Sequence, residues 1–235
     1  MTGRPDRLES YEAYADNYEG PRFTDWLRKR SEPAWSDATT HRFTQQLGAD
    51  TLDTNVFSQY LIQDYAFVET LVGAFGQAVG QAPSMAAKRR LIEFLDVITD
   101  EENDYFERSF TALGLPAEMR TDPELTDTTE AMTDLLVAAA NEGGYAETLA
   151  VLVPAEWVYL EWAQREATDR PESFYFDEWI ELHANPGFVS FVQWLRRQLD
   201  TVGPTLPTPQ QARVMRYFER TVALEAAFFE SAYRA

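Results

Sequence analysis

The sequence contains no cysteine and only two histidines, His41 and His183, among its 235 residues. Without cysteine, disulfide bonds, thiolate metal sites and cysteine nucleophiles are excluded. Paired metal sites in helical bundles use Glu-x-x-His repeats, and neither histidine follows a glutamate by three residues. We therefore expect no metal, haem or other cofactor. On its spacing alone, at the end of a helix before a turn, His183 is interpreted as a surface or capping residue.

Several other patterns are absent. There is no G-x-G-x-x-G or Walker loop for phosphates and no G-x-S-x-G setting for a serine nucleophile. No apolar run reaches about 18 residues, so we expect no membrane span. The first twenty residues are polar and acidic and lack the basic and apolar regions of a signal peptide. We expect a cytoplasmic protein.

Positive charge is scarce, with 20 basic against 39 acidic residues and a formal net charge of −19. Such a surface repels phosphate backbones, so a nucleic-acid partner is not expected. Only Lys29 and Lys88 are lysines, and the acidic bias runs along the whole chain. This composition resembles that of proteins from salt-loving archaea, in which an acidic surface keeps the protein soluble.

Helical periodicity dominates the chain, and no alternating strand pattern is evident. We predict helices near 24–38, 40–47, 53–81, 84–113, 127–140, 144–168, 173–182, 187–201 and 207–233. They form one all-α multi-helix bundle over residues 24–235, with residues 1–23 as an N-terminal arm. Pro154 lies inside a helical pattern, where a kink either opens room beside Glu156 or bends the helix around the core.

The most informative feature is a carboxylate within the apolar stripe of each of three helices, at Asp64, Glu156 and Glu225. An unpaired buried carboxylate is costly, and it shifts its pKa or finds a partner. Three of them predict one polar pocket inside a helical protein. The alternative for Asp64 and Glu225 is a structural acid bound to arginine or to a backbone amide. The aromatic residues of these stripes are interpreted as core: Phe57, Tyr60, Phe228 and Phe229.

Carboxylates beside aromatic rings suit a flat, nitrogen-rich heterocycle. Aromatic faces stack on the ring, and carboxylates accept hydrogen bonds from its amino groups. A carboxyl group with a raised pKa can then act as a general acid or base.

Three segments resemble motifs of the TenA/thiaminase II family, in the order and spacing of that family. FSQYLIQDY, residues 57–65, followed by Phe67, resembles F-x-x-Y-x-x-Q-D-x-x-(Y/F). LVPAEWVYLEW resembles L-L-P-C-x-W-x-Y, and LEAAFFESAY resembles E-x-x-F-W-x-x-A-Y. The match runs from about Thr24 to the last residue.

The resemblance implies a haem-oxygenase-like all-α fold without haem and a homo-oligomer, commonly a tetramer. It implies hydrolysis of an aminomethyl-pyrimidine to the hydroxymethyl-pyrimidine and ammonia in thiamin salvage, with some relatives acting on thiamin or a formylamino-pyrimidine. By position, Asp64 binds the pyrimidine nitrogens, Phe67 packs on the ring, Tyr159 is a tyrosine of the site, and Glu225 is the catalytic glutamate.

This chain departs from the family pattern at three positions. Ala155 stands where the nucleophilic cysteine is expected, so the cysteine-less branch is the better comparison. His183 and Met132 stand where tyrosines are expected, and His183 is predicted to contact the substrate. Glu156, next to the missing cysteine, is our candidate for the additional acid or base. The alternatives are a protein that binds a pyrimidine or another metabolite without turnover and a metal-dependent oxidase on the same fold.

Overall fold

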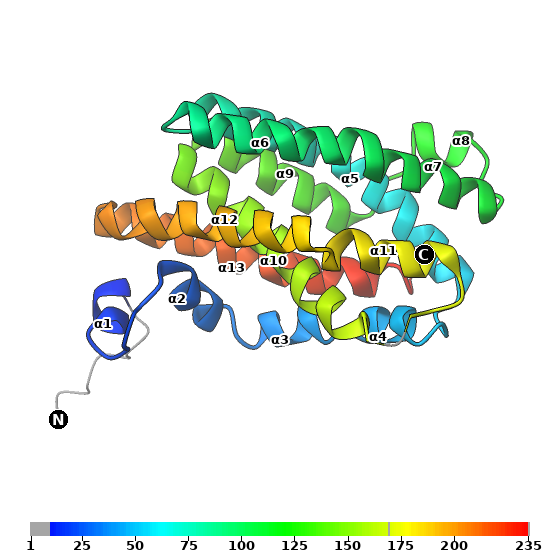
Figure 1. Cartoon of the computed structure of the whole chain (residues 1–235), viewed down its shortest axis with the longest axis horizontal. Coiled ribbons are helices and arrows are strands. Elements are labelled where there is room, and N and C mark those ends of the chain that lie inside the picture. Colours follow the sequence, from blue (N-terminus) through cyan, green and yellow to red (C-terminus); the bar gives the residue numbers. More distant parts are fainter. Residues whose placement is uncertain (1–9, 169, 235) are drawn as a thin grey trace.

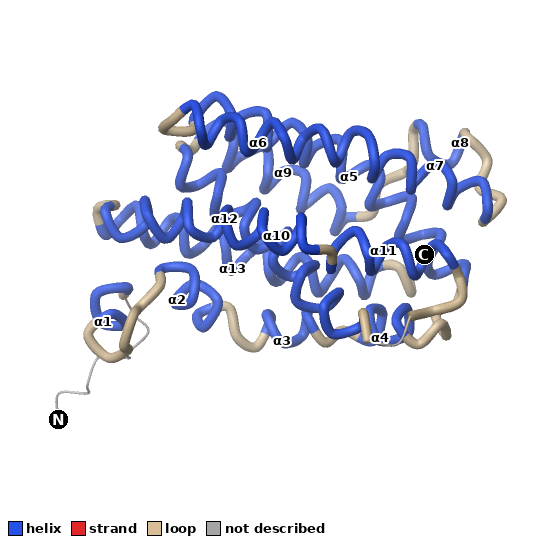
Figure 2. Tube along the Cα trace, in the orientation of Figure 1, coloured by secondary structure: helices blue, strands red, loops and turns tan. Residues whose placement is uncertain are grey.

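A computed structural model of the chain describes residues 10–168 and 170–234, and this part contains helices and no strand (Figure 2). The all-α prediction is therefore confirmed. The helices, in chain order, are α1 (Tyr11–Ala15), α2 (Phe23–Arg30), α3 (Ala34–Thr39), α4 (Arg42–Gly48), α5 (Thr54–Gln81), α6 (Met85–Val97), the π-helical turn η1 (Ile98–Glu102), α7 (Asn103–Ala112), α8 (Glu118–Thr121), α9 (Asp127–Glu142), α10 (Tyr145–Glu166), α11 (Phe174–Ala184), α12 (Pro186–Val202), the 3₁₀ turn η2 (Gly203–Thr205) and α13 (Thr208–Ser231).

The helices lie in layers around α10 (Figure 1). The α5, α6, α7 and α9 helices lie along one side, α12 and α13 run through the middle, and the short helices α1 to α4 lie on the opposite side. The α10 helix packs against α5, α9, α11, α12 and α13. Its sequence is apolar on all sides, as expected for a helix buried at the centre of a bundle.

Side chains at the starts of the long helices explain where these helices begin. Asp53 accepts a hydrogen bond from the backbone N–H of Asn55 before α5, and Ser84 accepts one from Ala87 before α6. Asn185 caps α12 in the same way, and Pro186 is the first residue of that helix. Caps of this kind satisfy backbone donors that have no partner within the helix.

Two of the predicted helices are interrupted. The segment predicted as one helix over 24–38 is α2 and α3, separated by Ser31, Glu32 and Pro33. Proline has no backbone N–H and disfavours helical geometry in the residue before it, which accounts for the break. The predicted helix over 84–113 contains the π-helical turn η1, and the short helices α1 and α8 were not predicted.

Pro154 is buried within α10, which runs from Tyr145 to Glu166 without interruption. The residues that follow it, Ala155 and Glu156, line the cavity described below.

The described part of the predicted N-terminal arm packs on the bundle. Tyr14 is buried, and the ring of Tyr11 lies edge-on to that of Trp26 in α2, with the ring centroids 6.0 Å apart. Residues 1–9 lie outside the described residues, and the division between residues 23 and 24 stays a prediction. Within the described residues, we find no helix with the length and apolar character needed to cross a bilayer.

Candidate active site

Four carboxylic acids from four different elements line one small cavity in the middle of the bundle. Asp64 comes from α5, Glu102 from η1, Glu156 from α10 and Glu225 from α13. Asp64, Glu156 and Glu225 are only 4%, 6% and 1% exposed. The three acids lie at one place because each belongs to the apolar face of its helix, and these faces are buried against one another.

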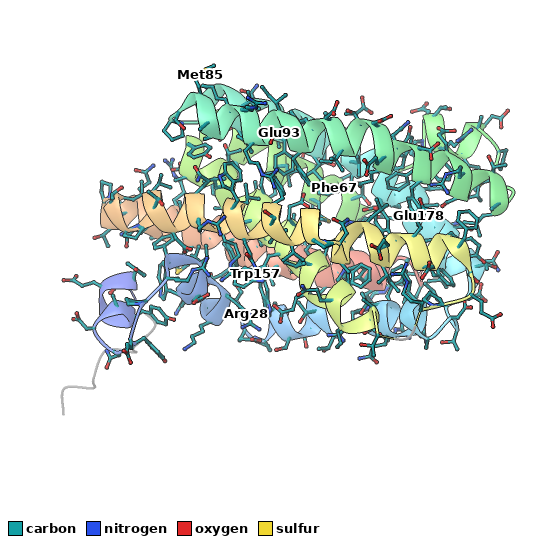
Figure 3. The ribbon with its side chains drawn as sticks, viewed as in Figure 1. Arg28, Phe67, Met85, Glu93, Trp157 and Glu178 are labelled. Atoms are coloured by element: carbon teal, nitrogen blue, oxygen red, sulfur yellow. The ribbon has the colours of Figure 1, made fainter. Side chains whose placement is uncertain are left out.

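The other predicted site residues line the same cavity. Phe67 follows Asp64 on α5 by nearly one turn, Tyr159 follows Glu156 on α10, and His183 lies in the last turn of α11. Figure 3 shows Phe67 between the α6 layer and the α11–α12 layer. All six residues therefore meet, although their roles in binding and catalysis stay predictions. The interpretation of Phe57, Tyr60, Phe228 and Phe229 as core is confirmed by their burial.

The interpretation of His183 as a surface or capping residue is wrong. His183 is buried, and its Nδ1–H donates to the carbonyl oxygen of Trp179 at 2.9 Å. Spacing alone failed because the histidine follows Trp179 by one helical turn and shares its buried face. Burial lowers the pKa of His183 to about 4. The imidazole is therefore neutral at pH 7, and its Nε2 is an acceptor.

The cavity gathers buried polar atoms that have no hydrogen-bond partner in the protein. Eight such side-chain atoms occur among the described residues, and four of them belong to residues that line this cavity. They are Oδ2 of Asp64, both carboxyl oxygens of Glu225 and the indole Nε1 of Trp179. Buried polar groups are normally paired, so three oxygens and one N–H donor around one space indicate a ligand with complementary groups.

A tyrosine pair holds Asp64 from one side. The hydroxyls of Tyr60 and Tyr159 lie 2.8 Å apart. Burial raises the pKa of Asp64 to about 7, while hydrogen bonds from Tyr60 and Tyr159 act in the opposite direction. These donors favour the ionised carboxylate. Asp64 can therefore exchange a proton near neutral pH.

The two glutamates on α10 and α13 hold their protons more firmly. Burial, and then the charge of Asp64, raises the pKa of Glu225 well above its ordinary value. Burial raises the pKa of Glu156 as well, with further contributions from the charges of Glu102, Glu225 and Asp64. Carboxyl groups that stay protonated at neutral pH can donate a proton, which is the property required of a general acid.

Two lining residues with polar groups were not predicted, namely Glu102 and Trp179. Glu102 is half-buried, and burial, together with the charge of Asp64, raises its pKa to about 8. It lies four residues after the buried Ile98 and four before the buried Phe106, the same pattern that identified Asp64. Glu102 was not predicted because it lies in the acidic run DEEND, residues 100–104. Such a run is typical of a solvent-exposed helix face.

No group of three or more His, Cys, Asp or Glu side chains among the described residues is arranged to hold a metal ion. The four carboxyl groups share a cavity without forming a coordination site. What this arrangement offers is proton transfer and hydrogen bonding against aromatic walls.

The helical bundle encloses carboxyl groups and aromatic rings in one buried cavity, an arrangement that suits a small, flat ligand. The chain belongs to the TENA/THI-4/PQQC family, whose profile matches residues 28–235. It is 26% identical over 216 residues to an aminopyrimidine aminohydrolase of Halalkalibacterium halodurans, covering 90% of this chain and 95% of that protein.

Solved structures support the same placement. The TenA homologue of Pyrococcus horikoshii superposes with a TM-score of 0.80 at 26% identity, covering 91% of this chain and 99% of the other. A domain of unknown function from Shewanella denitrificans with a haem-oxygenase-like fold has a TM-score of 0.59 at 13% identity, covering 92% and 94%. The resemblance to the family and to this fold is therefore confirmed.

Proposed function

We propose that this protein is a hydrolase of thiamin salvage that converts an aminomethyl- or formylaminomethyl-pyrimidine to the hydroxymethyl-pyrimidine. The observation that carries the proposal is the set of unpaired polar atoms of Asp64, Glu225 and Trp179 around one buried cavity. An aminopyrimidine has ring nitrogens and amino groups that complement these atoms. Relatives named aminopyrimidine aminohydrolase, at 23–26% identity over 90% or more of the chain, support the same assignment.

In this mechanism Asp64 binds and orients the pyrimidine through its nitrogens, and Phe67 packs on the ring face. The side chains of Tyr159 and His183 complete the binding surface. Tyr60 and Tyr159 position the Asp64 carboxylate through hydrogen bonds, so the ring is held in one orientation. Orientation of this kind lowers the entropic part of the barrier.

The chemical step exchanges a C–N bond for a C–O bond. Glu225 donates its proton to the departing amine. Glu156, in the fraction of molecules in which it is ionised, takes a proton from the water molecule that attacks the methylene carbon. The products are ammonia and the hydroxymethyl-pyrimidine, and proton transfer from Glu156 to Glu225 restores the site. General acid–base catalysis of this kind contributes about 10²–10⁴-fold. Because Ala155 occupies the cysteine position, no covalent intermediate forms there.

Ammonia release from an aminomethyl-pyrimidine by the purified protein in molar KCl tests the proposal. We expect release above the buffer rate, with Glu225→Gln as the inactive control. Binding of the pyrimidine without ammonia release would favour the non-catalytic metabolite-binding protein. Stoichiometric iron in the purified protein would instead favour a metal-dependent oxidase.

We also propose that the protein works in the cytoplasm as a homo-oligomer, a tetramer by its resemblance to the family. Its net charge of −19 suits a halophilic cytoplasm. Light scattering at molar KCl measures the oligomeric state, and a monomeric mass would refute this part of the proposal.

A further inference from the structure

The cavity lined by Asp64, Glu156 and Glu225, which we name the catalytic cavity, has a very small volume. It measures about 30 Å³, which holds roughly two water molecules. Pockets for drug-sized ligands begin at about 300 Å³. A pyrimidine therefore reaches Asp64 and Glu225 only if one wall of the cavity moves.

Two larger cavities adjoin the catalytic cavity, on either side of the π-helical turn η1. The first lies between α6 and the α11–α12 corner, measures about 280 Å³ and shares Glu102 and His183 with the catalytic cavity. We name it the α6–α12 cavity. The second lies against α5 and α7, measures about 590 Å³ and shares Val68 and Ile98. We name it the α5–α7 cavity. Each shared pair is a wall through which a ligand could pass.

The wall at Glu102 is the more polar of the two. Each wall has one buried residue, which is His183 here and Ile98 on the other wall, and one half-buried residue, which is Glu102 here and Val68 there. Glu102 is only half-buried, and among the described residues no hydrogen bond or ion pair holds its carboxyl group. Opening at Ile98 exposes apolar surface to water, whereas opening at Glu102 hydrates a carboxyl group.

The backbone at this wall is also unusual. Residues 98–102 form a π-helical turn within an otherwise α-helical segment from Met85 to Ala112. Such turns are rare and frequently occur at functional sites. Conversion of this turn to α-helical bonding shifts the register by one residue, which rotates Glu102 by about 100°. That rotation carries its carboxyl group out of the shared wall.

The α6–α12 cavity has walls suited to a flat ring. Phe94 and Phe191 stack in it, with ring centroids 3.6 Å apart and planes 14° apart. It also carries the carboxylates of Glu93 and Glu101 and the carboxyl group of Glu102, while its one arginine is paired with Glu93. Such walls attract uncharged or cationic planar molecules and repel phosphate esters.

We propose that the α6–α12 cavity is the access site of the enzyme and that Glu102 is the gate through which an uncharged or cationic planar ring passes to the catalytic cavity. The identity of the ring rests on the proposed function, whereas the route and the gate do not.

A single introduced thiol measures the route without any pyrimidine. The chain has no cysteine, so Ala155→Cys creates one thiol inside the catalytic cavity. Its rate of alkylation by iodoacetamide reports how often the cavity opens. Val97→Trp narrows the α6–α12 cavity, and Thr99→Trp, two residues further on, narrows the α5–α7 cavity. Both positions are exposed, so neither change overpacks the core.

We expect Val97→Trp to slow alkylation by about tenfold or more and Thr99→Trp to change it by less than about twofold, because access tracks local opening of one wall. The opposite ranking, or equal effects of the two variants, would overturn the proposed route.

Two variants at adjacent glutamates test whether Glu102 is the gate. Glu102→Ala should speed alkylation by about tenfold, whereas Glu101→Ala, a neighbouring carboxylate that lines only the α6–α12 cavity, should stay within about twofold. Equal rates for the two variants, with unchanged circular dichroism, would refute the role of Glu102.

The hydroxymethyl-pyrimidine should protect the thiol of Ala155→Cys from alkylation, and its phosphate ester should not. If neither compound protects the thiol, the proposed function is refuted, while the proposed route and gate are unaffected. If both compounds protect it equally, the proposed exclusion of phosphate esters from the α6–α12 cavity is refuted.

Discussion

The buried carboxyl group of Asp64 makes a quantitative prediction about stability. Its pKa is about 7 in the folded protein against an ordinary value of 3.8. A pKa raised by folding means that the folded state binds the proton more tightly than the unfolded chain does. Its contribution is fully present below the unfolded pKa and is lost as the pH rises through the folded pKa. Since one pH unit is worth about 1.36 kcal/mol, the complete loss is about 4 kcal/mol.

The substitution Asp64→Asn keeps the shape of the side chain and removes its titration. Relative to the parent, the variant should gain about 3 kcal/mol of unfolding free energy between pH 5 and pH 8, and little more at higher pH. The gain arises because the parent must ionise a buried carboxyl group over this interval and the variant has none. Stability gained by removing a site residue is the expected trade-off between stability and function.

Equilibrium urea unfolding followed by far-UV circular dichroism, in molar KCl at several pH values from 5 to 8, measures this difference. The exposed Asp122→Asn is the control for a general change in charge, and it should show a small difference that does not depend on pH. A parent-to-variant difference for Asp64→Asn that stays constant across the interval would refute the assignment of a raised pKa to this group.

Three further predictions use other properties of the chain. Glu225→Gln should lower turnover by about 10²-fold or more, measured as ammonia release, and still bind the hydroxymethyl-pyrimidine; turnover equal to the parent would exclude Glu225 as the proton donor. Gly203→Ala should cost about 1–3 kcal/mol in urea unfolding, because its Cβ would lie 2.3 Å from the ring of Phe23; an unchanged midpoint would contradict that packing. The net charge of −19 should weaken folding in dilute buffer, where screening falls, so a melting temperature independent of KCl would argue against a halophilic surface.

The helices could be predicted from the sequence because their signals are local. Apolar spacing and the capping residues Asp53, Ser84 and Asn185 fix where the long helices begin. The π-helical turn η1 could not be predicted, since no local motif in the sequence specifies it. Pro33 indicates a break between α2 and α3, but the apolar periodicity continues across this position and favoured a single helix.

The candidate site divides in the same way. Asp64, Glu156 and Glu225 were found because an acid inside an apolar stripe conflicts with burial, and that conflict is visible in one helix at a time. Glu102 obeys the same rule, but the neighbouring acids hid it. Trp179 gave no signal, because a buried tryptophan is ordinary and only the structure shows that its N–H has no partner.

The four acids act as one set, and their order of ionisation follows from the structure. Like charges in one small cavity cannot all ionise together, so protons leave the set in sequence. Asp64, with a pKa of about 7 and two tyrosine donors, ionises most readily, and Glu102 follows at about 8. The negative charge on Asp64 then helps to keep Glu225 protonated. In the proposed mechanism, Asp64 is therefore the carboxylate that binds the ring at neutral pH, and Glu225 is the carboxylic acid that protonates the leaving amine. This division of labour requires no cysteine at position 155.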